Sequence, residues 1–384
     1  MAFTPRAYQQ EAIDKAKHFF EEKKKYNAIQ ILPTGSGKSV VIANIAMQLP
    51  GKTIVFQPSK EILAQNYAKF ISYGYRAGIY SASANTKRIE KTTFATIGSV
   101  IKKKYLFQDI DHIIIDECDL VNSEDGMYRD FIHSIPEQKA LGLTATPYRL
   151  TTGSDGAMLS FLTRTNPRIF SSILSYVQTS TLFESGHLCK LIYDDKSQID
   201  RGRLVYNSTG TGFTEQSIRD VFGKADMVSK IINEAKDILS KRKNLLIFCE
   251  SIQDAKRVTL SIPGARLITG DTLPAERDLI LKSQQANKIR CVVNVGVLRV
   301  GYDYPELEAV LMGFSTMSLR VYYQVIGRGM RIHANKKDCL IVDLGGNYNF
   351  FGKIETMEIR TCEKGHYSIW NGNKALTNVT FTKT

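Results

Sequence analysis

A glycine-rich turn that contains one lysine and ends in a serine is the clearest chemical feature of the sequence. It reads Pro33-Thr34-Gly35-Ser36-Gly37-Lys38-Ser39 and lies between an apolar run at 28–32 and a helix-like run at 40–49. A buried strand that leads through such a turn into a helix points backbone N–H groups at one anion. The ammonium group of Lys38 would reach the β- and γ-phosphates of a nucleotide, and the Ser39 hydroxyl would bind Mg²⁺. The turn therefore predicts a nucleoside triphosphate site.

Adjacent acids follow another apolar run. Asp116-Glu117-Cys118-Asp119 comes directly after Ile113–Ile115, so the carboxylates lie at the carboxyl end of a buried strand, where open parallel sheets bind ligands. Nucleotide hydrolysis needs one carboxylate to hold Mg²⁺ and another group to orient the attacking water. We assign the first role to Asp116 and the second to Glu117, and the protein is predicted to be an NTPase.

Two arginines in the second half of the chain complete the predicted chemistry. Residues 324–331 read Gln-Val-Ile-Gly-Arg-Gly-Met-Arg, and the spacing of Arg328 and Arg331 predicts that they share one face of a helix. Guanidinium groups stabilise the charge that develops on a γ-phosphate. Because these arginines and the phosphate loop belong to different halves, we expect the site to close between two domains, which links nucleotide state to domain movement.

The elements that must position these groups are short apolar, β-rich runs that alternate with helical patterns. We predict helices at 14–25, 60–71, 126–134 and 254–262. Strands are predicted at 28–32, 53–56, 93–97, 112–115 and 140–144, and again at 244–249, 265–268, 290–295, 309–314 and 338–343. The central runs are continuously apolar, as in sheets covered on both faces. The predicted fold class is α/β, with two open, mostly parallel sheets in tandem.

These patterns also suggest domain boundaries. We predict a first α/β domain at 1–150 and a second at 226–352. Residues 151–225 contain loop-like, glycine-rich stretches and a helical pattern between Arg168 and Ser185, so they are interpreted as a connector and the entry to the second domain. Residues 353–384 form an extension without a readable motif.

Taken in order, the motifs resemble those of superfamily-two helicases of the DEAD/DEAH type, which have two RecA-like domains, and the resemblance covers nearly the whole chain. It implies that the nucleotide is ATP, with Gln9 reading adenine beside Arg6, and it makes 116–119 a relative of the DEAD box. It also implies contacts of the first domain with a nucleic-acid strand and a motif that couples hydrolysis to strand movement. The implied strand contacts are Pro58, Ser59, Lys60, Thr96 and Ser99, and the coupling residues are Thr144 and Thr146.

The second half carries the remaining motifs of that family. The resemblance implies strand contacts by Glu250, Ser251, Thr269 and Gly270, nucleotide contacts by Gly301 and Asp303, and a catalytic last motif with Gln324, Arg328 and Arg331. The amino-acid sequence at 268–272, 275–278 and 325–331 is similar to that of RadD-like bacterial DNA helicases. Short phage helicases contain a similar set of motifs. The cysteine-rich tail of the RadD-like proteins has no counterpart in these 384 residues.

Charge and cysteine content narrow the class of partner and site. The net charge is +13, and the basic excess is spread over both halves, which suits a polyanion lying across two domains. The six cysteines include no C-x-x-C pair, so we expect reduced core thiols rather than a disulfide framework or a zinc site. No apolar signal segment or membrane span is recognisable. We expect a monomer in the cytoplasm of a bacterial or phage-infected cell.

Three functions fit these motifs. The first is an ATP-dependent DNA helicase or translocase in repair, recombination or replication, with ATP and Mg²⁺ as cofactors and single-stranded or branched DNA as the partner. An RNA helicase stays open, because 116–119 differs from the DEAD sequence at one residue. The third is a nucleic-acid-stimulated ATPase that clamps a strand without unwinding it, since hydrolysis and unwinding use the same motifs. In each case we expect binding through phosphates, largely independent of base sequence.

Overall fold

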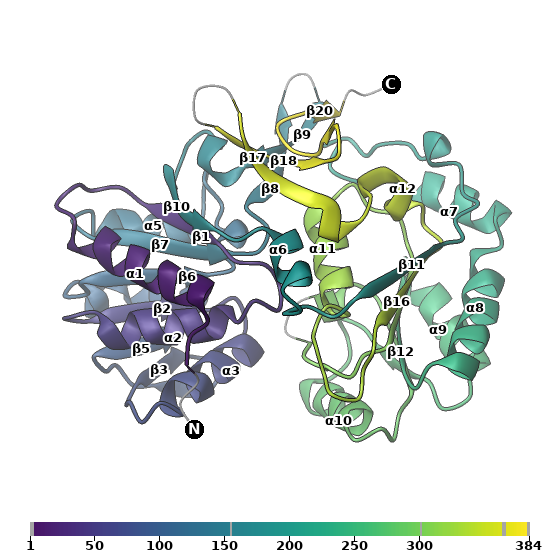
Figure 1. The fold of residues 1–384 in the computed structure, drawn as a ribbon, viewed down its shortest axis with the longest axis horizontal. Coiled ribbons are helices and arrows are strands. Elements are labelled where there is room, and N and C mark those ends of the chain that lie inside the picture. Colours follow the sequence, from purple (N-terminus) through teal and green to yellow (C-terminus); the bar gives the residue numbers. More distant parts are fainter. Residues whose placement is uncertain (1–3, 154–155, 300–301, 363–365, 382–384) are drawn as a thin grey trace. The chain divides into compact units, whose positions relative to one another are not determined.

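The computed structural model describes residues 4–153, 156–299, 302–362 and 366–381. The chain divides into two compact units, the first formed by Met1–Arg149 with Ser160–Gln178 and the second by Leu150–Leu159 with Thr179–Thr384 (Figure 1). Each unit has a parallel sheet of its own, which confirms the predicted α/β class with two sheets in tandem.

The first unit is built on an eight-stranded sheet of order β10-β1-β7-β6-β2-β5-β3-β4. All neighbouring strands are parallel except β3 and β4. The strands are β1 (Ala28–Ile31), β2 (Thr53–Phe56), β3 (Gly78–Ser81), β4 (Thr86–Lys87), β5 (Thr92–Ala95), β6 (His112–Asp116), β7 (Lys139–Thr144) and β10 (Ser172–Tyr176).

Helices cover both faces of this sheet because alternate strand residues point to opposite sides. Val55 and Ile114 face a core shared with α1 (Ala7–Glu21), α2 (Lys38–Gln48) and α3 (Lys60–Ile71). On the other face, Phe56 packs 5.0 Å from the Phe131 ring of α5 (Met127–Ser134). The connection between β5 and β6 consists of α4 (Ile97–Val100) and a 3₁₀ stretch, η1 (Ile101–Phe107), and η2 (Cys118–Leu120) follows β6.

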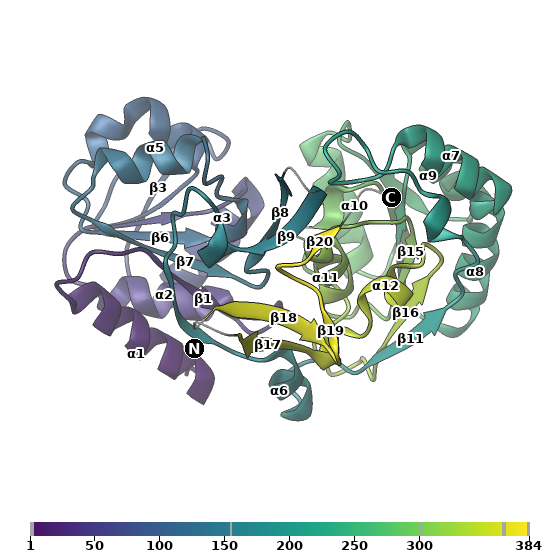
Figure 2. The same cartoon turned by 90° about the horizontal axis from the view of Figure 1, so that it is seen from above.

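The second unit has a six-stranded, all-parallel sheet of order β11-β16-β15-β12-β14-β13. Its core is shared with α7, α8 and α9, which Figure 2 shows on one side of the sheet. The strands are β11 (Leu191–Asp195), β12 (Leu245–Cys249), β13 (Arg266–Ile268), β14 (Cys291–Asn294), β15 (Ala309–Gly313) and β16 (Cys339–Asp343). The helices are α6 (Thr179–Glu184), η4 (Arg201–Arg203), α7 (Glu215–Lys224), α8 (Met227–Lys241), α9 (Ile252–Ser261), α10 (Pro274–Gln285), η5 (Val297–Arg299), α11 (Leu319–Gly327), α12 (Asn347–Phe351) and η6 (Ile354–Thr356).

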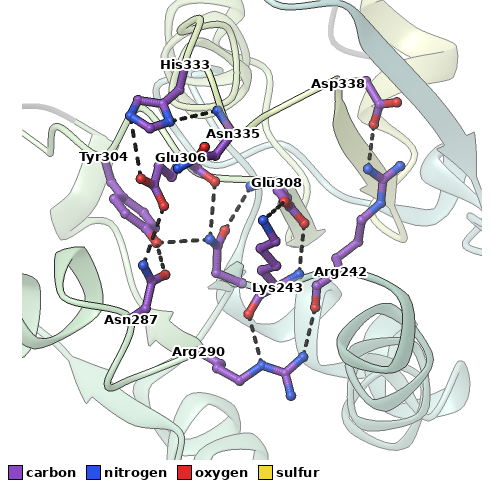
Figure 3. A network of polar contacts seen from close by, with 11 residues as sticks. Arg242, Lys243, Asn287, Arg290, Tyr304, Glu306, Glu308, His333, Asn335 and Asp338 are labelled. Carbon is purple, nitrogen blue, oxygen red and sulfur yellow. Dashed lines mark hydrogen bonds and ion pairs between the residues drawn. The ribbon is translucent and has the colours of Figure 1, made fainter.

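A polar network closes the amino ends of this second sheet (Figure 3). Asn244, one residue before β12, donates to the Tyr304 hydroxyl at 3.0 Å and accepts from the backbone N–H of Glu308 at 2.8 Å. Arg290, one residue before β14, donates to the carbonyl of Lys243 at 2.9 Å. Because these contacts use side chains at the starts of the strands, the opposite, carboxyl edge is left for ligands, as is usual in parallel sheets.

Two small sheets complete the fold. Within the predicted extension 353–384, β17 (Met357–Thr361), β18 (Tyr367–Asn371) and β19 (Lys374–Ala375) form an antiparallel sheet. β20 (Thr380–Phe381) pairs with β9 (Gly156–Phe161), which adjoins β8 (Tyr148–Gly153), and η3 (Leu162–Arg164) follows β9. No helix among the described residues is long and apolar enough to cross a membrane.

The helical pattern predicted between Arg168 and Ser185 is only partly confirmed. Ser172–Tyr176 is strand β10, paired with β1, and only Thr179–Glu184 is helical. β10 is formed by pairing with a strand more than 140 residues earlier in the chain, and such pairing overrides a local helical pattern. The predicted connector also holds β11, an edge strand of the second sheet, while the predicted domain boundaries themselves stay a prediction.

Candidate functional site

The predicted phosphate loop joins β1 to α2 in a conformation that needs its two glycines. Gly35 and Gly37 have φ values of 83° and 82°, a left-handed region that side chains with a Cβ atom rarely enter. Gly37 is the N-cap of α2, which begins at Lys38. Free N–H groups of the first helical turn and of the loop can therefore meet a phosphate, as predicted.

The start of α1 lies directly against this loop. Gln9 donates from Nε2 to the Ser36 carbonyl at 2.7 Å and accepts from the Arg6 backbone N–H at 2.8 Å. The Tyr8 hydroxyl donates to the same carbonyl at 2.7 Å. A Cβ atom at position 37 would lie 2.5 Å from Gln9 Nε2. The structure thus brings Arg6 and Gln9 to the loop, whereas adenine recognition by Gln9 stays a prediction.

The loop lysine meets the acids that follow β6. Lys38 Nζ lies 3.1 Å from Glu117 Oε1. Burial lowers the pKa of Lys38, but the carboxylates of Glu117 and Asp116 outweigh this and raise it overall. Burial, reinforced by Glu117, raises the pKa of Asp116 to about 7. β1 and β6 both adjoin β7 in the sheet, which explains how residues almost 80 positions apart become neighbours.

The sequence reasoning missed Asn66, which holds Asp116 in place. Asn66 Nδ2 donates to Asp116 Oδ2 at 2.9 Å and to Gln57 Oε1 at 2.8 Å. Asn66 shares the buried face of α3 with Leu63 and Phe70. A lone amide at the helical spacing of an apolar face was the available signal.

The donors around the loop suit the phosphates and metal of a nucleotide. Asp116 ends a strand beside the loop, and its carboxylate oxygen is the kind of hard ligand that Mg²⁺ prefers. Ser39 lies in the first turn of α2. These two residues would hold Mg²⁺, while Lys38 would bind the phosphates themselves; the bound metal would neutralise charge that develops during hydrolysis.

The predicted coupling residues are connected to the acids by hydrogen bonds. Thr144 Oγ1 donates to Asp119 Oδ1 at 2.8 Å. The Thr146 backbone N–H donates to Thr144 Oγ1 at 2.9 Å. All three side chains are buried. A change in position of the acids after β6 can therefore reach the turn after β7 through two hydrogen bonds.

The predicted strand contacts of the first unit follow the neighbouring strands β2 and β5. Pro58, Ser59 and Lys60 come after β2, and Ser59 caps α3 by accepting from the Ile62 N–H at 3.3 Å. Thr96 and Ser99 come after β5, and their hydroxyl oxygens lie 3.0 Å apart. These residues share the carboxyl edge of the sheet, and their role toward nucleic acid stays a prediction.

In the second unit the predicted contacts also follow strands at the carboxyl edge. Glu250 and Ser251 come after β12, and Thr269 and Gly270 after β13. Glu250 accepts from the Ser315 N–H at 3.1 Å, and Ser251 caps α9 by accepting from the Asp254 N–H at 3.1 Å. Glu250 and Ser251 line a cavity of about 670 Å³ between α7, α8 and α9. Their role toward nucleic acid stays a prediction.

The arrangement predicted for the two arginines is wrong. Helix α11 ends at Gly327, so Arg328 and Arg331 do not share a helical face. Gly329 packs against Cys339, where a Cβ atom would lie 2.5 Å from the sulfur. This close packing and the poor helix propensity of glycine explain the early end.

Each arginine has separate partners instead. Arg328 is buried and donates to the carbonyls of Tyr302 at 2.6 Å and Gln324 at 3.2 Å. Arg331 forms an ion pair with Asp303, and burial lowers its pKa to about 10. Two predicted motifs therefore do meet at Arg331 and Asp303. Gly301, predicted to contact the nucleotide, lies outside the described residues.

Comparison with known proteins identifies the family. The model of the "Type III restriction enzyme, res subunit" family matches residues 2–149, and that of the "Helicase conserved C-terminal domain" matches residues 223–333. The two matches fall on the two sheets, in the order predicted from the motifs. The chain belongs to the superfamily-two helicases. The predicted enzyme class, a nucleic-acid-dependent ATPase, agrees with this family.

A helicase and a DNA translocase from distant organisms are similar over most of the chain. "Putative ATP-dependent helicase IRC3" of Saccharomyces cerevisiae is 25% identical over 89% of this chain and 51% of its own length. "DNA 3'-5' translocase XPB2" of Sulfurisphaera tokodaii is 24% identical over 88% of this chain and 81% of its own. The chain thus spans about half of the length of the yeast relative.

A solved structure shows the same fold. The "ATP-dependent Type ISP restriction-modification enzyme LlaBIII bound to DNA" superposes with a TM-score of 0.63 at 17% identity, over 88% of this chain and 27% of that chain. The predicted tandem RecA-like architecture is confirmed. The predicted closeness to RadD-like helicases stays a prediction.

Proposed function

We propose that this protein is an ATP-dependent DNA helicase or translocase that couples ATP hydrolysis to movement along, or unwinding of, DNA. The observation that carries the proposal is the continuous set of contacts from the phosphate loop to the coupling turn. Lys38 pairs with Glu117, and Asp119, two residues later, bonds to Thr144. A nucleotide that draws Lys38 away from Glu117 would therefore disturb residues connected to Thr146.

The chain's own residues have distinct roles in this proposal. Lys38 binds the β- and γ-phosphates through its ammonium group, and loop N–H groups bind oxygens of the same phosphates. Glu117, released from Lys38, accepts a hydrogen bond from the attacking water and orients it. Asp116, held by Asn66, would offer its carboxylate to Mg²⁺ from a fixed position. Arg328 and Arg331 stabilise charge on the γ-phosphate, with Gln324 beside them, which stays a proposal.

DNA is the partner that the relatives favour over RNA. A translocase similar to 88% of this chain is named as acting on DNA, and the basic excess suits either polymer. We propose action on single-stranded or branched DNA in repair, recombination or replication, by a monomer in the cytoplasm of a bacterial or phage-infected cell. A strand clamp that hydrolyses ATP without unwinding is the alternative that the same motifs permit.

The test is ATP turnover with single-stranded, duplex and forked DNA and with RNA, in Mg²⁺. We expect DNA to stimulate turnover more than RNA does, and forked DNA to be unwound. Turnover that no nucleic acid changes would contradict the proposal. Stimulation by DNA without unwinding or translocation would assign the protein to the clamp class, and stronger stimulation by RNA would make it an RNA helicase.

A further inference from the structure

The tetrapeptide Lys-Lys-Lys-Tyr occurs twice in the first unit, at 23–26 and at 102–105. In both copies the second lysine lies over the tyrosine ring. Lys24 Nζ is 5.6 Å from the Tyr26 centroid, and Lys103 Nζ is 5.7 Å from the Tyr105 centroid. The two copies are locally alike, so differences in their surroundings indicate what each one does.

The first copy is packed and partly neutralised. It lies between α1 and β1, at the amino edge of the sheet. The Tyr26 ring packs edge-on against Phe19 at 5.2 Å, and its hydroxyl donates to Glu22 at 3.1 Å. Lys25 forms an ion pair with Glu137. Tyr26 and Lys25 thus have partners within the unit, whereas Lys23 and Lys24 are exposed.

The second copy is exposed to solvent between two buried anchor residues. Val100 and Phe107 are fully buried, and Phe107 packs 5.0 Å from the Tyr80 ring. Between these anchors, five consecutive residues, 102–106, are exposed. Tyr105 is 63% exposed and Leu106 is 42% exposed. Across the part of the chain that the structure describes, none of the lysines 102–104 pairs with a carboxylate, and nearby Asp109 is paired with Lys52 instead.

The second copy also begins next to the predicted strand contacts. Helix α4, which starts after Thr96, runs directly into η1, and the backbone first leaves helical angles at Lys103. Ser99 and Lys102 are therefore three residues apart on one helical turn, so they lie on the same face. The lysines 102–104 are held in an exposed position next to the predicted strand contacts, and none of them pairs with a carboxylate among the described residues. The packing of the first unit does not explain this arrangement.

We propose that Lys102–Tyr105 binds single-stranded nucleic acid and lengthens the strand-binding surface that includes Thr96 and Ser99. The three ammonium groups bind backbone phosphates, and the exposed Tyr105 ring stacks on an unpaired base. A stacking surface beside three phosphate-binding cations reads no base edges, so this contact tolerates any sequence. The inference rests on the proposed function and names a further part of its nucleic-acid site.

The repeat supplies its own control. K102A/K103A/K104A and K23A/K24A/K25A remove the same number of charges from the same sequence motif in the same unit. Affinity for a fluorescent oligo-dT strand is measured by anisotropy over a range of salt concentrations, without nucleotide. For single strands, the slope of log K against log salt falls by about 0.7 for each phosphate that the protein no longer neutralises. We therefore expect this slope to fall by about 2 for the 102–104 variant and to change little for the 23–25 variant.

The aromatic contact is tested separately with Tyr105→Ala and Tyr105→Phe. Loss of a stacked ring weakens single-strand binding about fivefold or more, whereas Tyr105→Phe keeps the ring and should bind as the parent does. ATP turnover without nucleic acid should be unchanged in all four variants, which shows that each one is folded.

Three results would count against the inference, and a fourth would count against the proposed function on which it rests. Equal loss of affinity in both triple variants would attribute binding to net charge. Unchanged DNA affinity with altered self-association of the 102–104 variant would assign this surface to a protein contact. A parent protein that binds no nucleic acid would contradict the proposed function itself, whereas a parent that binds normally with unaffected variants contradicts only this inference.

Discussion

Glu117 is the residue on which the proposed chemistry depends most. Its backbone is left-handed, with φ 50° and ψ 52°, a conformation that costs a non-glycine residue about 1–2 kcal/mol. Such strain is retained mainly where surrounding contacts fix it, often at functional sites. Here the strain accompanies an ion pair between Glu117 and Lys38, both mostly buried. The ion pair keeps the two groups together until a phosphate competes for the lysine.

Replacing Glu117 with glutamine tests this role. Glu117→Gln keeps the size of the side chain but replaces the carboxylate that orients the attacking water with a neutral amide, which is a weaker acceptor and cannot take the proton of the water; positioned acid–base groups contribute about 10²–10⁴ in rate. We expect turnover to fall at least about a hundredfold. Nucleotide affinity should hold or increase, because a negative charge near the phosphates is removed. Turnover assays and fluorescent-nucleotide titration measure both, with the exposed Glu61→Gln as the control; parental turnover in Glu117→Gln would refute the assignment.

Thr144 tests the connection to movement. Thr144→Val keeps the shape but removes the donor to Asp119, and an unmet buried hydrogen bond costs about 1–3 kcal/mol. We expect a loss of stability in that range by urea unfolding, with DNA unwinding reduced far more than ATP turnover. If the two activities fall in parallel, Thr144 supports the site without coupling it.

The sequence predicted that three motif residues belong to one site, and their roles in it stay a prediction. Lys38, Asp116 and Glu117 carry types and spacings that few other structures use, and the structure brings all three together. Asn66 and Tyr8 were missed because their partners, Asp116 and Ser36, lie 50 and 28 residues away. The lone amide on the apolar face of α3 indicated a buried polar residue at Asn66, but its partner could not be named, since the contact arises only when the strands assemble.

At the scale of elements, the junction between the phosphate loop and α2 joins backbone conformation to packing. Gly37 meets two demands at once, a positive φ and a neighbour, Gln9, that leaves no space for a Cβ atom. Gly74, after α3, has a similar φ of 84° but open space around it. Comparing the two glycines therefore separates backbone strain from steric crowding.

Gly37→Ala and Gly74→Ala are a matched comparison. Both substitutions carry the left-handed penalty of about 1–2 kcal/mol, but only the Gly37→Ala methyl group must also displace Gln9 from Ser36. We expect a larger loss of stability for Gly37→Ala in urea unfolding, together with weaker nucleotide binding, and parental nucleotide binding for Gly74→Ala. Equal losses in both variants would show that Gln9 yields without cost.

Helix and strand ends show where local patterns stop being informative. The helix α3 was predicted at 60–71, as observed, because Ser59 caps it and its apolar face has helical spacing. The helix α11 ends before Arg328 because Gly329 must approach Cys339. Gly329 and Cys339 become neighbours only when β16, which begins at Cys339, takes its place in the sheet. The local sequence pattern around Gly329 therefore cannot predict this contact.

At the scale of the molecule, the two sheets carry complementary parts of the predicted machinery. The first unit contains the phosphate loop, the acidic residues after β6 and the turn after β7. The second unit contains Gln324, Arg328 and Arg331. The tandem order of two α/β units was predictable because continuously apolar strands and short helices recur in both halves of the sequence. The discontinuity of the first unit was not, since it depends on which strand β10 pairs with.

Arg331 tests whether the second unit takes part in hydrolysis. Loss of an arginine that stabilises phosphoryl-transfer charge costs about 10³-fold or more in rate. We expect Arg331→Ala to lose about that factor in turnover while nucleotide affinity changes only a few-fold. Arg331→Lys, which keeps the charge and ion pairing with Asp303, controls for a merely structural loss. Parental turnover in Arg331→Ala would place the arginine outside the reaction.

The late strand β10 has a consequence for how the protein is made. During synthesis, the first sheet lacks its edge strand until residue 176 has left the ribosome, well after β1, β6 and β7 are available. Until then β1, whose isoleucines are buried in the finished fold, is the edge strand of the sheet. The unpaired backbone N–H and C=O groups of such an edge can pair with a strand of another chain. An expression fragment cut at residue 150 would keep that edge permanently, and one that ends after residue 178 would cover it.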